Sequence, residues 1–327
     1  MIQPIELKKE LPMQVANGVM STTTKVWDIL VASKKGDVES VRKMVDDCPE
    51  LIYAQYNYTP PVYFAVRENH EPLVKFLLGR GALDHTYITY PFKESLLQVA
   101  EDRGYQNIVS LLQQYLADPD QCKYKGDNGE INYNRSQLEN EFETAVDRGD
   151  LAETEKIIKQ APEVLKELTY FWGEGILMMP AKDKKFELIN LLQSFGARVP
   201  DISKWCQFYY FKHYDMAAFL LEKGMNPDHM SWHHVTLLHD MAQKGDIQKA
   251  SLLIKYGADI NPVDEEYKST PLGLAAKWGN TEMVQYLLEQ GADPDKAAAT
   301  WASPLAWARK KGHADIKNIL TQAGAHE

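Results

Sequence analysis

Histidine is the residue type in this sequence that first suggests chemistry, because imidazole is the commonest zinc ligand in proteins. The chain has nine histidines, and more than half of them fall between positions 213 and 239. Such a concentration is compatible with a metal site. The members of this group are His213, His229, His233, His234 and His239.

Cysteines and carboxylates supply no recognisable catalytic constellation. Cys48, Cys122 and Cys206 are far apart and form no C-x-x-C pair, so they indicate reduced thiols in the cytosol, with no disulfide framework or zinc knuckle. The acidic runs 101–102 and 264–266 are more typical of solvated faces or turns than of an acid/base couple. The nucleophile elbow, the H-E-x-x-H pair, the P-loop and the G-x-G-x-x-G fingerprint do not occur. We therefore expect no enzymatic activity.

Composition restricts the class of partner. The 327 residues are 44% hydrophobic and 25% charged, as in globular proteins with a packed core. A net charge of −10 disfavours binding to nucleic acid or to an anionic membrane, because both require a positive field. No apolar stretch approaches the roughly 20 residues that would cross a bilayer. Residues 1–24 lack the order of a secretory signal and are interpreted as a capping or loosely ordered extension. We expect a cytoplasmic protein.

The elements that must position these residues form an internal repeat. The clearest copy spans 269–293, with Ser-Thr-Pro-Leu at its start, Ala275–Ala276 before a turn at Gly279, an apolar segment 283–288 and a closing Gly-Ala-Asp. Proline suits the first turn of a helix, and glycine accepts the left-handed conformation between two helices. Two further copies fit the same frame at 236–259 and from 303 onward.

Turn positions extend this frame through the chain. Six of the eight spacings between successive turns are 33 to 35 residues, and the exceptions are 45 and 28. The long spacing predicts an inserted loop, and the short one predicts a trimmed outer helix or connection near residues 199–201. The predicted turns are Gly36, Asn69, Gly104, Gly149, Lys184, Lys212, Gly245, Gly279 and Gly312.

The repeat resembles the ankyrin family, in which a Thr-Pro-Leu opening, an Ala-Ala inner helix, a glycine turn and an apolar outer helix recur. The resemblance covers about residues 25–327, strongly from Trp232 onward and weakly between Leu138 and Tyr214. It implies an all-α solenoid of about nine repeats, which stack because one repeat alone cannot bury its apolar faces. The predicted organisation is an extension or cap at 1–24, three repeats at 25–115, an inserted loop at 116–137 and six repeats at 138–327.

The same resemblance gives four of the histidines a structural explanation. His239 holds the last place of the Thr-Pro-Leu-His pattern, where the family's histidine bonds to backbone between repeats. His70, His213 and His313 follow interhelical turns, another position at which the family favours histidine. We therefore predict no metal and no cofactor. Most family members bind proteins and have no activity of their own, so the predicted function is non-enzymatic protein binding.

Aromatic residues indicate where a partner binds. In ankyrin proteins, partners contact the finger loops before the inner helices and the exposed ends of those helices. Large exposed apolar patches often mark interaction sites, in which Trp and Tyr dominate. Lysines 182, 244, 277, 310 and 311 edge the predicted strip, so an acidic segment with apolar anchors is the expected ligand. The predicted partner-binding residues are Trp172, Glu174, Tyr210, Phe211, Trp232, His233, Tyr267, Trp278 and Trp301.

Three alternatives stay open from the sequence. The aromatic rings could fill the cores between repeats, as we expect for Trp205 and Tyr209. A groove lined by Trp172, Tyr210 and Trp232 could hold a small molecule or a metal. An enzyme could use the same groove with Glu174, His233 or Asp240 as its acid or base, and a strongly shifted pKa there would favour that reading.

Overall fold

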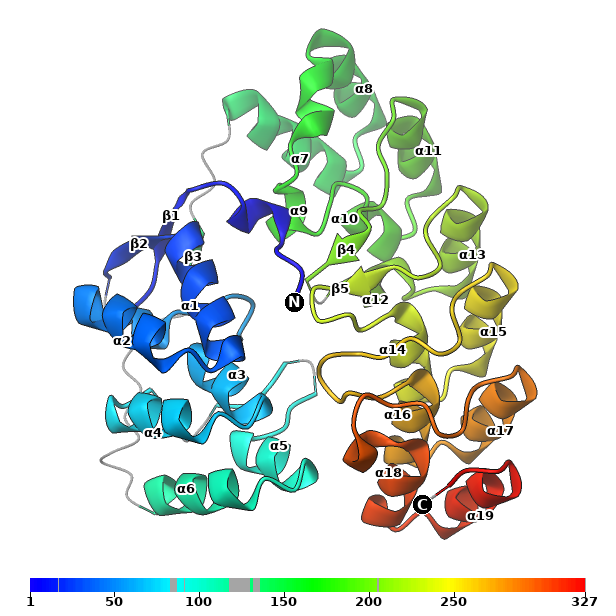
Figure 1. Cartoon of the computed structure of the whole chain (residues 1–327). Coiled ribbons are helices and arrows are strands. Elements are labelled where there is room, and N and C mark those ends of the chain that lie inside the picture. Colours follow the sequence, from blue (N-terminus) through cyan, green and yellow to red (C-terminus); the bar gives the residue numbers. More distant parts are fainter. Residues whose placement is uncertain are drawn as a thin grey trace. The chain divides into compact units, whose positions relative to one another are not determined.

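The computed structural model describes residues 1–16, 18–82, 87–90, 92–117, 130–131, 136–204 and 206–326. This part of the chain is mostly helical, with the α-helices labelled α1 to α19 in Figure 1. Five strands of two or three residues accompany them. The all-α prediction is therefore corrected to a mostly helical fold, because short extended segments between helices pair with one another.

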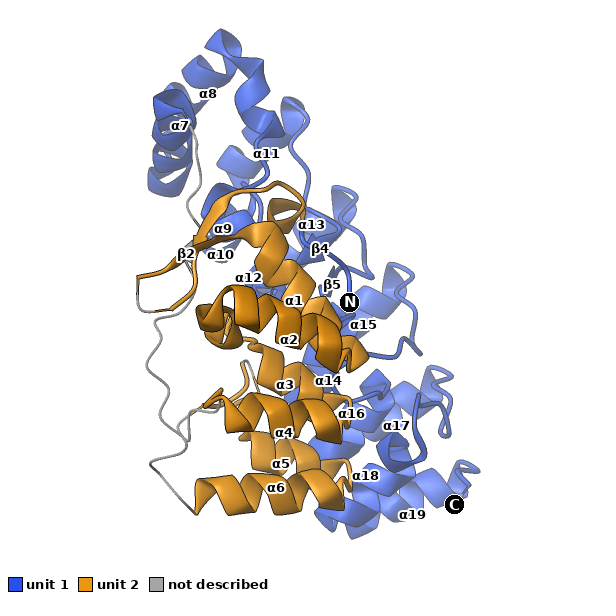
Figure 2. Ribbon diagram, turned by 60° about the vertical axis from the view of Figure 1, so that its left-hand side comes forward, with its two compact units in different colours: residues 1–4, 135–327 blue, residues 5–134 orange. Residues whose placement is uncertain are grey.

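The chain divides into two compact units (Figure 2). Unit 1 comprises residues 1–4 and 135–327, and unit 2 comprises residues 5–134. The division at 134/135 falls within the predicted insertion 116–137. Of that insertion, residues 118–129 and 132–135 lie outside the described residues.

Unit 2 contains three helix pairs and a small sheet. Strand β1 pairs antiparallel with both β2 and β3, so the N-terminal extension and the segment before residue 132 meet in one sheet. Leu7, Met13 and Val15 of the extension are buried. That the extension caps the repeats stays a prediction. The elements are η1 (Ile5–Leu7), β1 (Pro12–Gln14), β2 (Met20–Thr22), α1 (Thr23–Lys35), α2 (Val38–Asp47), η2 (Pro49–Tyr53), α3 (Pro61–Arg67), α4 (Glu71–Gly79), α5 (Leu96–Asp102), α6 (Gln106–Leu116) and β3 (Glu130–Ile131).

Unit 1 contains six helix pairs, of which the first helices form an inner row and the second helices an outer row (Figure 1). Strands β4 and β5 pair in parallel between two connections. The elements are α7 (Gln137–Arg148), α8 (Leu151–Gln160), η3 (Pro162–Lys166), α9 (Tyr170–Gly173), α10 (Met178–Lys182), α11 (Phe186–Ser194), β4 (Ile202–Ser203), α12 (Gln207–Tyr210), α13 (Tyr214–Glu222), β5 (Met230–Ser231), α14 (Leu237–Lys244), α15 (Ile247–Lys255), α16 (Pro271–Trp278), α17 (Thr281–Glu289), η4 (Thr300–Ala302), α18 (Pro304–Lys311) and α19 (Ala314–Gln322).

Local chemistry explains where the inner helices begin and end. Thr270 caps α16 by accepting a hydrogen bond from the Gly273 N–H at 3.3 Å, and Pro271 occupies the first turn. The helix ends at Gly279, whose φ of 79° is left-handed. Inner helices then contact one another in series from α10 to α18. Ala275 and Ala276 are fully buried in α16, where their small side chains allow the neighbouring inner helices to approach closely.

Each of the nine predicted turns lies between the two helices of a pair. That all nine pairs are ankyrin repeats stays a prediction. The short spacing before Lys212 does not come from a trimmed outer helix, because α11 keeps nine residues. The predicted alternative, a short connection, holds in part: residues 195–206 between α11 and α12 number 12, against 15 for residues 256–270 between α15 and α16. The inner helix α12 is also short, with four residues against eight in α14, α16 and α18.

Candidate interaction surface

His239 links two successive repeats by hydrogen bonds, as predicted. Nδ1 of His239 accepts the backbone N–H of Thr236 at 3.1 Å, which leaves Nε2 to donate to the Ser269 carbonyl of the next repeat at 3.2 Å. His239 is fully buried, and burial lowers its pKa, with the Asp264 charge opposing that shift. The ring is a neutral structural link.

The histidines after the interhelical turns also have the predicted structural role. Each Nε2 atom lies close to a backbone carbonyl in the inner helix of the preceding helix pair. The distances are 2.8 Å for His70, 3.2 Å for His213 and 3.3 Å for His313. Asn280 fills the same position between its neighbours and donates to the Ala242 and Gln243 carbonyls. In the described ranges, no three His, Cys, Asp or Glu side chains gather as a metal ion would require.

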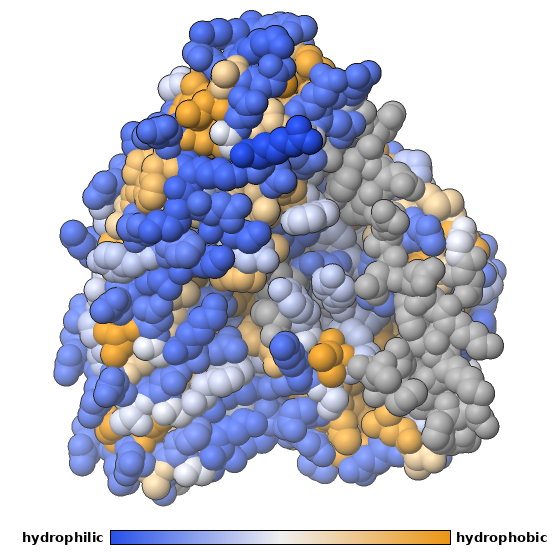
Figure 3. Space-filling model, turned by 180° about the vertical axis from the view of Figure 1, so that it is seen from behind, coloured by the Kyte–Doolittle hydropathy of each residue, from blue (hydrophilic) through white to orange (hydrophobic). Residues whose placement is uncertain are grey.

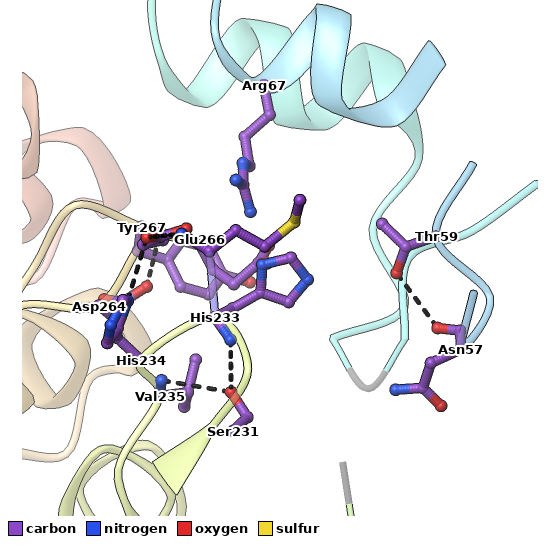
Figure 4. Close-up of polar contacts among 12 residues, drawn as sticks. Asn57, Thr59, Arg67, Ser231, His233, His234, Val235, Asp264, Glu266 and Tyr267 are labelled. Atoms are coloured by element: carbon purple, nitrogen blue, oxygen red, sulfur yellow. Dashed lines mark hydrogen bonds and ion pairs between the residues drawn. The ribbon is translucent and has the colours of Figure 1, made fainter. Parts of the chain in front are cut away.

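The finger loops before α14 and α16 are held by buried polar contacts (Figure 4). Ser231 Oγ accepts the N–H groups of His233 and Val235, each at 3.3 Å. Nδ1 of His233 lies 3.1 Å from a Glu266 oxygen, and both side chains are buried. These contacts fix the shape of the loops.

Burial corrects most of the predicted strip. Six of its nine residues are at most 2% exposed, so their expected exposure is wrong. Tertiary packing explains this: the Trp232 ring stacks on His233 with centroids 4.1 Å apart, and the Tyr210 hydroxyl donates to the Glu174 carbonyl at 2.7 Å. The buried residues are Glu174, Tyr210, Phe211, Trp232, His233 and Tyr267.

Trp172 has the opposite character, because 63% of its surface is exposed. It lies in a turn whose backbone is left-handed at Phe171 (φ 48°), at Trp172 (φ 62°) and at Gly173 (φ 78°). Such a conformation is strained for bulky residues and persists only where the surroundings impose it. Here the Phe171 N–H donates to a Glu143 carboxylate oxygen, and Lys204 Nζ donates to the Trp172 carbonyl. The fold therefore holds an aromatic ring in solvent.

Trp278 and Trp301 are half-buried at the end of α16 and in the finger before α18. Trp278 meets the Tyr267 ring edge-on at a centroid distance of 5.3 Å. The ammonium group of Lys277 lies 3.8 Å from the Tyr267 centroid, 4.7 Å from that of Trp278 and 4.6 Å from that of Trp307. This cation–π cluster fixes a positive charge beside Trp278 and Trp307.

Of the three residues named for an alternative enzyme, Glu174 and His233 have separate partners, whereas Asp240 has a shifted pKa of the kind that would favour such a site. Glu174 accepts the Lys204 N–H at 3.1 Å, and His233 pairs with Glu266. Burial raises the pKa of the Asp240 carboxyl to about 6, with nearby Lys244 opposing the shift. Burial, with the Glu174 charge adding to it, raises the pKa of the Cys206 thiol far above its usual range, which makes it a poor nucleophile.

Two aromatic residues important to this surface were not predicted to be exposed there. Phe208 and Tyr209 of α12 are half-buried, although Tyr209 was expected in the core, and Trp205 lies outside the described residues. Their position four and three residues before the Lys212 turn, where α16 has alanines, is the sequence signal that could have identified them.

Figure 3 shows the molecule from behind, coloured by the hydropathy of each residue. Hydrophilic side chains predominate there, and hydrophobic ones form small separate patches. Among the described residues, no helix is both long and apolar enough to span a membrane.

Comparisons with known proteins cover the C-terminal part of the chain. A family model described as "Ankyrin repeats (3 copies)" matches residues 205–298 and again 238–326. The ankyrin repeat protein nuc-2 of Neurospora crassa is 37% identical over 86 residues, which are 26% of this chain and 8% of the relative. The human ARF GTPase-activating protein GIT1 is 32% identical over 85 residues, or 26% of this chain and 11% of the relative. The match spans about a tenth of these relatives. Residues 205–326 are ankyrin repeats.

Proposed function

We propose that this chain is a non-enzymatic interaction module that binds a protein partner through the finger loops and inner helices of unit 1. Ankyrin repeats are generally protein-interaction modules, and such repeats occupy residues 205–326. The observation that supports the face most directly is the solvent-exposed Trp172 ring on its constrained turn. Tryptophan is enriched among the residues that dominate binding energy, and a pre-ordered side chain loses little entropy when it binds.

The half-buried Trp278 and Trp301 are the secondary contacts of this proposal, and the Lys277 ammonium group lies over the Trp278 ring. The six buried residues of the predicted strip shape the loops and are not proposed to touch the partner. A partner segment with acidic residues and apolar anchors suits this combination of rings and ammonium groups.

Quantitative affinity capture from the native cell tests the proposal. Wild type and the Trp172→Ala variant are compared with Tyr214→Ala, a matched control whose ring is 49% exposed on the outer helix α13. We expect proteins that are retained by wild type and by Tyr214→Ala and lost with Trp172→Ala, and their affinities are then measured with purified components. Identical sets from all three proteins would contradict the proposed face.

A further inference from the structure

The short inner helix α12 carries two bulky rings where its neighbour carries small residues. Phe208 and Tyr209 occupy the positions, relative to the following turn, that Ala275 and Ala276 occupy in α16. Their rings meet edge-on with centroids 4.4 Å apart, and both are half-buried. The small alanines allow the neighbouring inner helices to approach closely. The Phe208 and Tyr209 rings are larger and leave part of their apolar surface exposed to solvent.

A lysine from each neighbouring inner helix lies over this ring pair. Nζ of Lys182, the last residue of α10, is 5.5 Å from the Tyr209 centroid. Nζ of Lys244, the last residue of α14, is 5.3 Å from the Phe208 centroid. Cation–π contacts hold an ammonium group over a ring without neutralising its charge. The result is a row of cation, ring, ring and cation, which we call the lysine–aromatic row: Lys182, Tyr209, Phe208 and Lys244.

The charges of this row are available to a ligand. Within the described part of the chain, neither ammonium group has a carboxylate within 4 Å, although Asp240 and Asp246 act on Lys244 at longer range. Lys244 is exposed and Lys182 is half-buried. Lys204 is buried and donates to the Trp172 carbonyl, so it is not counted in this site. A chain with net charge −10 thus presents a local cationic site.

Building on the proposed function, we infer that the lysine–aromatic row selects partner segments with two acidic side chains on either side of an apolar one. The two cation–π distances and the distance between the ring centroids limit the separation of the two ammonium groups to at most about 15 Å. An extended chain advances about 3.3–3.6 Å per residue, so the two acidic residues are at most about four positions apart. The apolar side chain between them covers the Phe208 and Tyr209 rings.

Fluorescence polarisation with synthetic peptides and the full chain tests this inference. The probe is fluorescein-labelled Ser-Gly-Glu-Ala-Leu-Ala-Glu-Gly-Ser, whose two glutamates are four positions apart and share one face of an extended chain with the central leucine. One comparison peptide replaces both glutamates with glutamine, and another, Glu-Gly-Ser-Ala-Leu-Ala-Ser-Gly-Glu, has the same composition with the glutamates at its ends. We expect the first probe to bind best, and the Lys182→Met and Lys244→Met variants each to weaken it about fivefold at low salt.

Lys255→Met is the matched control, because Lys255 makes the same kind of contact with Tyr256, at 5.8 Å, on the outer helix α15. It should leave the affinity unchanged. Absence of probe binding to wild type, equal binding of the three peptides, or equal weakening by Lys255→Met would overturn the inference. Tighter binding of a single-stranded oligonucleotide than of the probe would overturn it in favour of phosphate recognition.

The two proposals fail in different ways. The captured partner could be lost with Trp172→Ala but retained with the Lys182→Met/Lys244→Met double variant. That result would support the proposed interaction face and overturn the inference that the lysine–aromatic row selects acidic segments. If the partner is retained with all of these variants, both proposals fail.

Discussion

At the scale of single residues, burial separates tryptophans that look alike in the sequence. Trp232 is fully buried against His233, whereas Trp172 is mostly exposed on a left-handed turn. A buried ring contributes transfer free energy and leaves a cavity when removed, and an exposed ring does neither. The two residues therefore have separable roles, one in stability and one in binding.

Trp232→Ala should lower the free energy of unfolding by about 3–5 kcal/mol, because the cavity left by a buried tryptophan is only partly filled. Trp172→Ala should change it by about 0.5 kcal/mol or less, as surface substitutions usually do. Urea titrations of both variants and wild type measure the difference. Equal losses for the two variants would show that the Trp172 ring is packed in solution.

Buried His229 makes the folded state sensitive to acid. Burial lowers the pKa of this ring to about 4, with a backbone contact from Pro200 opposing the shift, whereas an unfolded histidine titrates near 6.5. As the pH falls, the histidine of the unfolded state binds a proton before that of the folded state. The contribution of His229 to the free energy of unfolding is therefore fully present above about pH 6.5, and up to about 3 kcal/mol of it is lost as the pH falls towards 4. His239, whose pKa is also lowered, acts in the same direction. We expect His229→Gln to unfold in urea with a smaller loss of stability between pH 6.5 and 4 than wild type.

Buried Asp240 changes the free energy of unfolding with pH in the opposite direction, over a pH range that overlaps that of His229. Its pKa of about 6 exceeds the ordinary 3.8, mainly because of burial. The folded state therefore keeps its proton longer, and stability present below pH 4 is lost as the pH rises through 6, by roughly 2–3 kcal/mol. Asp240→Asn should be more stable than wild type at pH 7 and gain little at pH 4. Parallel pH profiles for wild type and Asp240→Asn in urea would count against this assignment.

At the scale of elements, two of the turns between paired helices require glycine for different reasons. Gly279 and Gly312 share left-handed φ values of 79° and 76°. A Cβ atom at Gly279 would lie 2.8 Å from the His313 ring, whereas one at Gly312 would meet nothing within 4 Å. Gly312 therefore isolates the backbone effect, and Gly279 adds a steric one.

Gly312→Ala should cost about 1–2 kcal/mol from the left-handed backbone alone, and Gly279→Ala should cost more because the His313 ring must move from its carbonyl partner. Thermal and urea unfolding of the two variants give the comparison. The clash has no energetic effect if the two substitutions prove equally destabilising.

These elements also show how far the sequence predicts the structure. Thr270, Pro271 and Gly279 act on their own neighbours, so the bounds of α16 could be read from local chemistry. Exposure depends on residues distant in the chain, so the sequence around Trp232 does not indicate that its ring is fully buried. Trp172 is exposed, but its left-handed turn depends on Glu143 and Lys204, which no local pattern connects to it.

At the scale of the whole molecule, the main contacts of each helix pair in unit 1 are with the adjacent pairs, so a perturbation should spread according to its place in the stack. Leu253 in α15 and Leu320 in α19 are both fully buried, but one is internal and the other is in the last helix. Leu320→Ala should accelerate amide hydrogen exchange in α18 and α19 alone. Leu253→Ala should accelerate it on both sides of α15, and mass spectrometry of peptic fragments distinguishes the two patterns. Uniform acceleration across residues 136–326 by Leu320→Ala would contradict this nearest-neighbour behaviour.

The brevity of α12 has a mechanical consequence. A four-residue inner helix provides fewer backbone hydrogen bonds and less buried interface to its neighbours than the eight-residue helices α14, α16 and α18. Under a stretching force applied through the two ends of unit 1, we expect the array to yield first at α12, with the segment from α14 to α19 extending later as a separate step. Unit 1 would then extend under tension in two steps, separated at α12. The lysine–aromatic row spans α10, α12 and α14, and therefore lies across the element expected to yield first.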